Sequence, residues 1–81
     1  MQVKVKFSGL FYSIAGVEED IVDIEDGGTI RHVIEVMRHK YKKLPLQDGQ
    51  TFFMVDNKIA KSDQILTEGD RIIMFRMLAG G

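Results

Sequence analysis

The chain ends in Gly80 and Gly81, and the carboxylate of Gly81 is the group whose position most favours chemistry. A carboxylate is a poor acyl donor until it forms a mixed anhydride with a phosphate. Glycine has no Cβ, so such an end can be threaded through a narrow channel and can take backbone angles that other residues avoid. The terminus, with Ala79 before it, is therefore a candidate acyl donor once its carboxylate is activated.

Few other residues combine in a way that suggests chemistry. His32 and His39 lie two turns apart on an expected helix, and without a third ligand type beside them they read as surface histidines. The chain has no cysteine, so a thiolate nucleophile and a cysteine zinc site are excluded. No Ser/His/Asp arrangement, P-loop or carboxylate pair stands out. We expect no bound metal or cofactor and no catalysis by the chain alone.

The composition narrows the class of protein. A chain of 81 residues makes one small domain, and 44% hydrophobic with 28% charged residues is typical of a folded globular chain. The apolar runs, such as residues 52–55, are far too short to span a membrane. A net charge of −1 offers no basic footprint for nucleic acid. We therefore expect a cytoplasmic protein that binds neither membranes nor nucleic acids.

Hydrophobic periodicity predicts five strands. Residues 3–7 alternate apolar and lysine side chains, which is typical of a strand with one wet face. Residues 19–25 and 51–55 are the next strands, and a tight reversal at 56–58 leads into a short strand from residue 59. Residues 71–78 form a last strand that is apolar on both faces, which favours a central position. Residues 10–15 are expected to be a connection that folds back on the core, and 26–28 and 67–70 to be turns.

One helix is predicted over residues 29–42, with Thr29 as its N-cap. Its apolar stripe has helical spacing and consists of Ile30, Val33, Ile34, Met37 and Tyr41. One such helix can cover one face of one sheet. We predict an α+β domain over residues 1–78, with a mixed sheet of about four to five strands, the first and last side by side in the middle. Residues 79–81 are expected to be a flexible tail.

Several motifs together carry a family resemblance. Val55-Asp56, the run Leu66-Thr67-Glu68-Gly69-Asp70 and the terminal Gly80-Gly81 resemble the sulfur-carrier proteins of the MoaD/ThiS type, which have the ubiquitin-like β-grasp fold. The resemblance covers essentially the whole chain. It identifies the sequence as similar to the small subunit of molybdopterin synthase in particular.

The resemblance implies that partner proteins activate the C-terminus and supply and receive the sulfur. An E1-like enzyme would use ATP to adenylate Gly81, and a sulfur donor protein would convert the acyl-adenylate to a thiocarboxylate. Gly80 and Ala79 would be threaded through the partner's channel. The tail would then enter the large catalytic subunit of molybdopterin synthase, where the sulfur is transferred to a pterin precursor.

Four positions depart from the family pattern. Arg76 and Met77 stand where prolines are common in molybdopterin-type tails, Asp56 replaces an asparagine, and Tyr12 replaces an arginine. These departures leave the client pathway open. The alternatives are a sulfur carrier for thiamine or another metabolite, a ubiquitin-like modifier joined to lysines, and a β-grasp binding module. The oligomeric state is open as well.

The last strand also suggests a partner surface. A strand that is apolar on both faces can turn one face to the core and the other to a partner, and exposed apolar patches often mark interfaces. The predicted interface residues are Phe75, Met77 and Leu78, together with Phe53 on the neighbouring strand.

Overall fold

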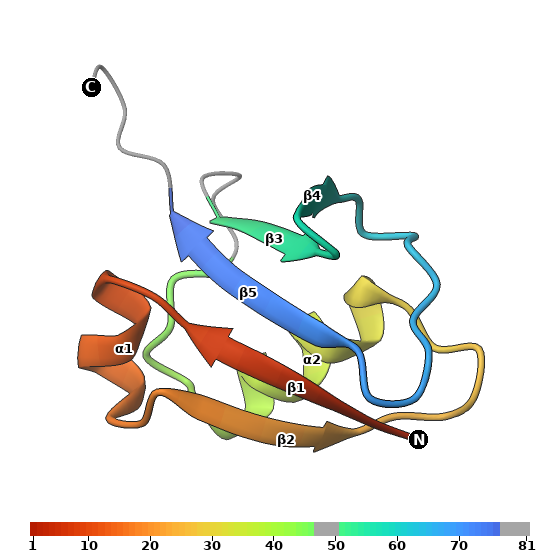
Figure 1. Ribbon diagram of the computed structural model, residues 1–81. Coiled ribbons are helices and arrows are strands. Elements are labelled where there is room, and N and C mark those ends of the chain that lie inside the picture. The colour runs from red at the N-terminus through yellow and green to blue at the C-terminus, as the bar shows by residue number, and fades with distance from the viewer. Residues whose placement is uncertain (47–50, 77–81) are drawn as a thin grey trace.

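The structure is a computed structural model that describes residues 1–46 and 51–76. These residues form five strands and two helices (Figure 1). The strands are β1 (Gln2–Phe7), β2 (Glu19–Asp23), β3 (Thr51–Val55), β4 (Lys58–Ala60) and β5 (Arg71–Arg76). The helices are α1 (Leu10–Ala15) and α2 (Ile30–Lys40). The order of elements agrees with the predicted α+β domain, except for α1.

The strands form one mixed sheet in the order β2-β1-β5-β3-β4. β1 and β5 pair in parallel at its centre, and the other neighbours are antiparallel. The prediction that the first and last strands lie side by side is therefore confirmed. Because β1 and β5 run in the same direction, their C-terminal ends lie at the same end of the sheet.

The core lies between the sheet and α2, which crosses one face (Figure 1). Alternate residues of β1, namely Val3, Val5 and Phe7, are buried, as the pleat of a strand requires. From α2 the buried side chains are Ile30, Val33 and Met37. Ile34, predicted to be in the core with them, is only partly buried, because its place on the helix turns it to the margin of the contact.

Both ends of α2 are held by side chains. Thr29 is the N-cap, as predicted, and its N–H donates to Nδ1 of His32 at 3.0 Å, so that histidine completes a capping box. At the other end, Tyr41 Oη and Lys40 Nζ both lie 2.7 Å from Oδ2 of Asp20 on β2. The helix thus ends at Lys40 rather than at residue 42, and its C-terminus is tied to an edge strand.

This cluster shifts two pKa values. Burial raises the pKa of the Asp20 carboxyl, but the hydrogen bonds from Lys40 and Tyr41 and the charge of Lys40 outweigh it and hold the pKa below 3.8. Burial, followed by the hydrogen bond to Asp20 and its charge, raises the pKa of Tyr41 to about 12. The neutral phenol and the ionised carboxylate are therefore the forms that the fold favours.

Residues 10–15, predicted to be a connection, form the short helix α1. Gly9 precedes it, and Gly16 ends it in the left-handed conformation with φ 79°. Phe11 is fully buried, which explains why the segment folds back on the core. Neither helix in the described part of the chain is long and apolar enough to cross a membrane.

The predicted reversals are confirmed. Asp56 and Asn57 both have positive φ, 53° and 64°, which is typical of the two-residue turn in a hairpin. The carboxylate of Asp70 accepts from the N–H and the hydroxyl of Thr67 at 2.8 and 3.1 Å, which closes the turn before β5. β2 ends at Asp23, two residues earlier than predicted, and β5 is described as far as Arg76.

Candidate functional site

The end of β5 is the base from which the predicted tail leaves. The N–H of Ser8, just after β1, donates to the carbonyl of Met74 at 3.2 Å. On the other side Arg76 pairs with Thr51 of β3. Ser8, Gly9 and Leu10 line a groove of about 270 Å³ together with Arg76. The end of β5 is thus fixed between β3 and the start of α1. The predicted site residues Met77, Leu78, Ala79, Gly80 and Gly81 lie outside the described residues.

An apolar surface lies beside this exit, on the face of the sheet opposite α2. Cross-strand pairing places Phe52 beside Phe75, and Met54 beside both Ile73 and Ile59. The rings of Phe52 and Phe75 stack with their centroids 5.8 Å apart and their planes at 29°. Ile59 is 61% exposed and the other four are partly exposed. We call these five residues the open-face patch: Phe52, Met54, Ile59, Ile73 and Phe75.

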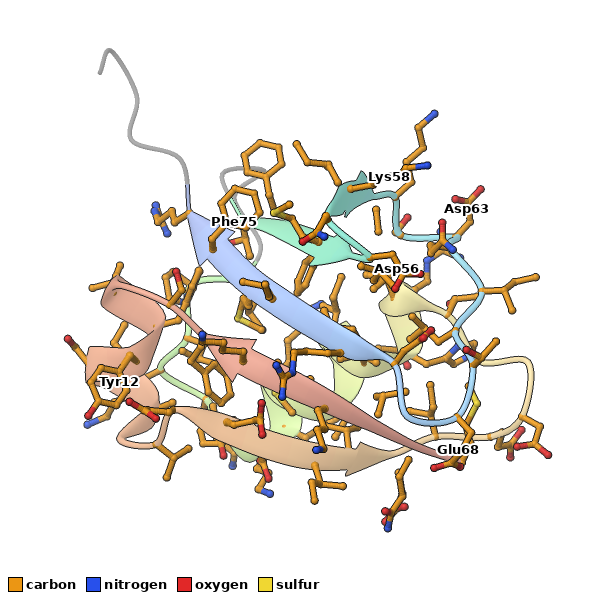
Figure 2. The ribbon with its side chains drawn as sticks, viewed as in Figure 1. Tyr12, Asp56, Lys58, Asp63, Glu68 and Phe75 are labelled. Carbon is orange, nitrogen blue, oxygen red and sulfur yellow. The ribbon has the colours of Figure 1, made fainter. Side chains whose placement is uncertain are left out.

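Phe75 is therefore on a surface, as predicted, and it lies near the end of β5 (Figure 2). The prediction is wrong for Phe53. That ring is only 6% exposed, pairs with Met74 and faces α2, because successive residues of a strand point to opposite faces. Phe52, the residue before it, lies on the surface beside Phe75, where Phe53 was predicted to lie. The sequence holds no local signal that separates the two, because Phe52 and Met54 are as apolar as Phe53 and Val55.

The other half of the open face is charged. Lys4 and Lys6 of β1 are exposed, and β5 begins with Arg71, which lies beside Lys4. Arg71 Nε is 3.5 Å from the carboxylate of Glu19 on β2. Such exposed ion pairs contribute little to stability. Lys4, Lys6 and Arg71 instead give the open-face patch a cationic border along β1, since Lys6 lies beside Ile73.

The two histidines have separate surroundings. His32 accepts the hydrogen bond of the helix cap, and His39 lies exposed two turns further along α2. Within residues 1–46 and 51–76, no group of three potential metal ligands is close enough to hold an ion. Tyr12, at the family's arginine position, is 48% exposed on α1 (Figure 2).

Comparison with known proteins gives one family match and several structural ones. The profile of the ThiS family matches residues 5–81. No curated protein sequence matches the chain significantly.

Three solved structures illustrate the structural likeness. SAMP1 from Haloferax volcanii has a TM-score of 0.88 at 15% identity, with both chains fully covered. A Pyrococcus furiosus protein described as molybdopterin converting factor, subunit 1, has a TM-score of 0.83 at 24% identity, covering 95% of this chain and 98% of that one. A ubiquitin from Caldiarchaeum subterraneum has a TM-score of 0.68 at 17% identity, covering 100% and 98%.

At these identities the solved structures establish the fold, which is the ubiquitin-like β-grasp. The family assignment comes from the profile, which extends over nearly the whole sequence and includes the terminal glycines. The chain therefore belongs to the ThiS family.

Proposed function

We propose that the carboxylate of Gly81 is adenylated and converted to a thiocarboxylate, and that the protein is the sulfur-carrying small subunit of a molybdopterin synthase. The observation that carries this proposal is the family match through residue 81, which includes the Gly80-Gly81 end. The protein would act in the cytoplasm and would not be an enzyme by itself.

The proposed chemistry has two steps at one carbon atom. The carboxylate oxygen of Gly81 attacks the α-phosphate of ATP in an E1-like enzyme, and pyrophosphate leaves. Sulfur from a donor protein, delivered at the oxidation level of sulfide, then attacks the carbonyl carbon, and AMP leaves. The tail becomes –C(O)S⁻, and the carrier needs no cysteine because the sulfur is held on its own terminus.

The open-face patch is proposed to dock the activating enzyme. It lies beside the end of β5, so a partner that covers it also receives the chain that follows Arg76. Stacked aromatic residues such as Phe52 and Phe75 are the kind of side chain that dominates binding at interfaces. The cationic border predicts acidic residues around the apolar area of the partner.

Mass spectrometry of the intact protein tests the proposal. Incubation with a cognate E1-like enzyme, ATP and a sulfur donor should add about 16 Da, since sulfur replaces one oxygen. Deletion of Gly81, or one extra residue after it, should abolish the conversion. Gly80→Ala should slow it sharply, because a Cβ obstructs a channel shaped for bare backbone. Unchanged mass with an active enzyme pair, or conversion of the extended tail, would refute the proposal.

The client is tested separately. The thiocarboxylated protein, mixed with the large catalytic subunit of molybdopterin synthase and its pterin precursor, should lose its sulfur and return to the starting mass. The similarity to the Pyrococcus furiosus protein favours this client over thiamine synthesis. Sulfur transfer in a thiazole-forming system instead would assign the chain to the thiamine branch.

A second candidate is a protein modifier, which the similarity to two structures of SAMP1, the small archaeal modifier protein 1 of Haloferax volcanii, favours. Its first step is the same adenylation of Gly81. A lysine amine of a target protein then attacks the carbonyl carbon, and an amide replaces the acyl-adenylate. Cell extract supplied with ATP and the E1-like enzyme should in that case give higher-mass conjugates, and tryptic peptides should carry residues 77–81 as a branch on lysine, because trypsin cuts after Arg76.

A further inference from the structure

An open groove of about 320 Å³ runs between the end of β2 and the side of α2. The helix lines it with side chains three and four residues apart, so that they share one stripe: His32, Glu35, Val36 and His39. The sheet side is formed by Asp23, Ile24 and Glu25. Neither the proposed tail chemistry nor the open-face patch uses these residues.

Among residues 1–46 and 51–76, no strand pairs with the backbone edge along this groove. β2 is the end strand of the sheet. Ile24 exchanges both backbone hydrogen bonds with Met1, at 2.9 and 2.7 Å. Because bonded and non-bonded pairs alternate in antiparallel strands, the adjacent pair of Gln2 with Asp23 is a non-bonded one. The N–H and C=O of Asp23 therefore point away from β1, toward the free edge.

The other end of β2 is protected. The N–H of Ile21, which also points to the free edge, is bound by the carboxylate of Asp20 at 2.8 Å. Asp20 is further tied to Lys40 and Tyr41. Side chains that occupy edge groups in this way block pairing with another strand. The unprotected part of the edge thus coincides with the groove.

The lining of the groove is apolar at its base and acidic at its rim. Ile24 and Val36 are partly buried and pack against the core. Three acidic residues, Asp23, Glu25 and Glu35, are among the lining residues, and the described part of the lining contains no lysine or arginine. The side chain of Asp23 lies on the open-face side of the β2 edge, because it alternates with Ile24 along the strand. In the part of the chain that the structure describes, the ion pairs join other residues: Met1 with Asp26, Lys40 with Asp20 and Arg71 with Glu19. A ligand that carries cations would meet these carboxylates without displacing an existing partner.

We propose that this groove binds an extended segment of a partner protein, which adds as a strand to the edge of β2. Strand addition draws its affinity from main-chain hydrogen bonds and its specificity from alternate side chains. One apolar side chain of the segment would lie over Ile24 and Val36. A lysine or arginine next to it would point to the other side of the edge, toward the carboxylate of Asp23, and one further along the α2 side would meet Glu35. The groove is separate from the open-face patch, so a partner held here would leave the end of β5 accessible.

A synthetic peptide tests the proposal without knowledge of the natural partner. The probe is acetyl-Lys-Val-Thr-Val-Thr-Lys-Lys-amide, titrated into ¹⁵N-labelled protein. The amide signals of residues 23–25 and of the α2 stripe should shift with saturation. The same peptide with glutamate in place of lysine should bind at least about fivefold more weakly, because attraction becomes repulsion. No shifts at about 1 mM peptide, or equal affinity for both peptides, would overturn the proposal.

Two further measurements separate strand addition from general attraction to acidic surface. Methylation of the peptide amides that would pair with β2 should weaken binding by about tenfold, whereas methylation of the outward amides should not. Glu35→Lys should weaken binding by about fivefold. The matched control is Asp63→Lys, the same charge change in the loop after β4, far from β2 (Figure 2), and it should leave the affinity unchanged. Equal losses in the two variants, or indifference to methylation, would refute strand addition.

Discussion

The two faces of the sheet carry similar apolar side chains but differ in burial, because α2 covers only one of them. On the face covered by α2, Phe53, Ile72 and Met74 are buried. On the open face their chain neighbours Phe52 and Ile73 are only partly exposed, yet no element of the described chain packs over them. A small domain gains stability from the face that its helix covers, whereas an apolar face left exposed often marks an interface. The comparison teaches that strand parity alone can place adjacent residues of one type in the core and on an exposed face.

The largest effect should come from truncating the covered face. Phe53→Ala should cost about 3–5 kcal/mol in the free energy of unfolding, because it removes a buried ring and leaves a cavity. Phe52→Ala should cost no more than about 1.5 kcal/mol, mainly the stacking with Phe75. Urea unfolding followed by circular dichroism measures both.

Because Phe53→Ala could prevent folding, two smaller substitutions make the same comparison. Ile72→Val on the covered face should cost about 1 kcal/mol, and Ile73→Val on the open face clearly less. Equal losses at the two positions would show that the open face contributes to the core and would abolish the distinction between the faces.

The next effect should appear in binding rather than in stability. Phe75→Ala should weaken binding to the E1-like enzyme by about 2 kcal/mol, close to thirtyfold, because it truncates an aromatic anchor of the open-face patch. Isothermal calorimetry measures the affinity, and thermal unfolding measures the stability. The matched control is Ile21→Ala, an exposed apolar residue on the charged half of the same face. A large loss of melting temperature with unchanged affinity would place Phe75 in the core.

The order and pairing of the elements could be predicted from the sequence, but the face on which each side chain lies could not. Alternation in β1, the stripe of α2 and the turn residues are local signals, and they predicted the order of elements and the central pairing of β1 with β5. The register between β3 and β5 depends on contacts distant in sequence, so Phe53 was assigned to the wrong face. The groove beside β2 was not predicted, because it needs β2 and α2 placed together.

A third effect concerns the hairpin that presents Ile59 on the open face. Asn57 has φ 64°, a conformation that costs a β-branched residue roughly 1–2 kcal/mol. Asn57→Val should lower the free energy of unfolding by that amount, whereas Asn57→Gly should leave it equal or slightly higher, since Asp-Gly suits this turn. Denaturant unfolding of both variants checks this. If valine were tolerated as well as glycine, the turn would not hold the left-handed backbone described.

The smallest effect lies at the rim of the covered face, where Tyr41 and Asp20 join α2 to β2. The folded pKa of Tyr41 is raised from 10.0 to about 12, so its contribution to stability is fully present below pH 10 and is lost as the pH rises toward 12. The folded pKa of Asp20 lies below 3.8, so its contribution is present above pH 3.8 and is lost as the pH falls below it.

Tyr41→Phe isolates this contact, because it keeps the ring that packs edge-on against Phe7, with centroids 5.2 Å apart, and removes only the hydroxyl. The wild type should melt at a higher temperature than the variant at neutral pH, and the difference should shrink as the pH rises through 10 toward 12. It should also shrink in acid, where Asp20 is protonated and loses the charge that the hydroxyl bonds. A difference that stays constant across the whole pH range would mean that the hydroxyl of Tyr41 contributes through packing, and that the charge of Asp20 does not hold α2 against β2.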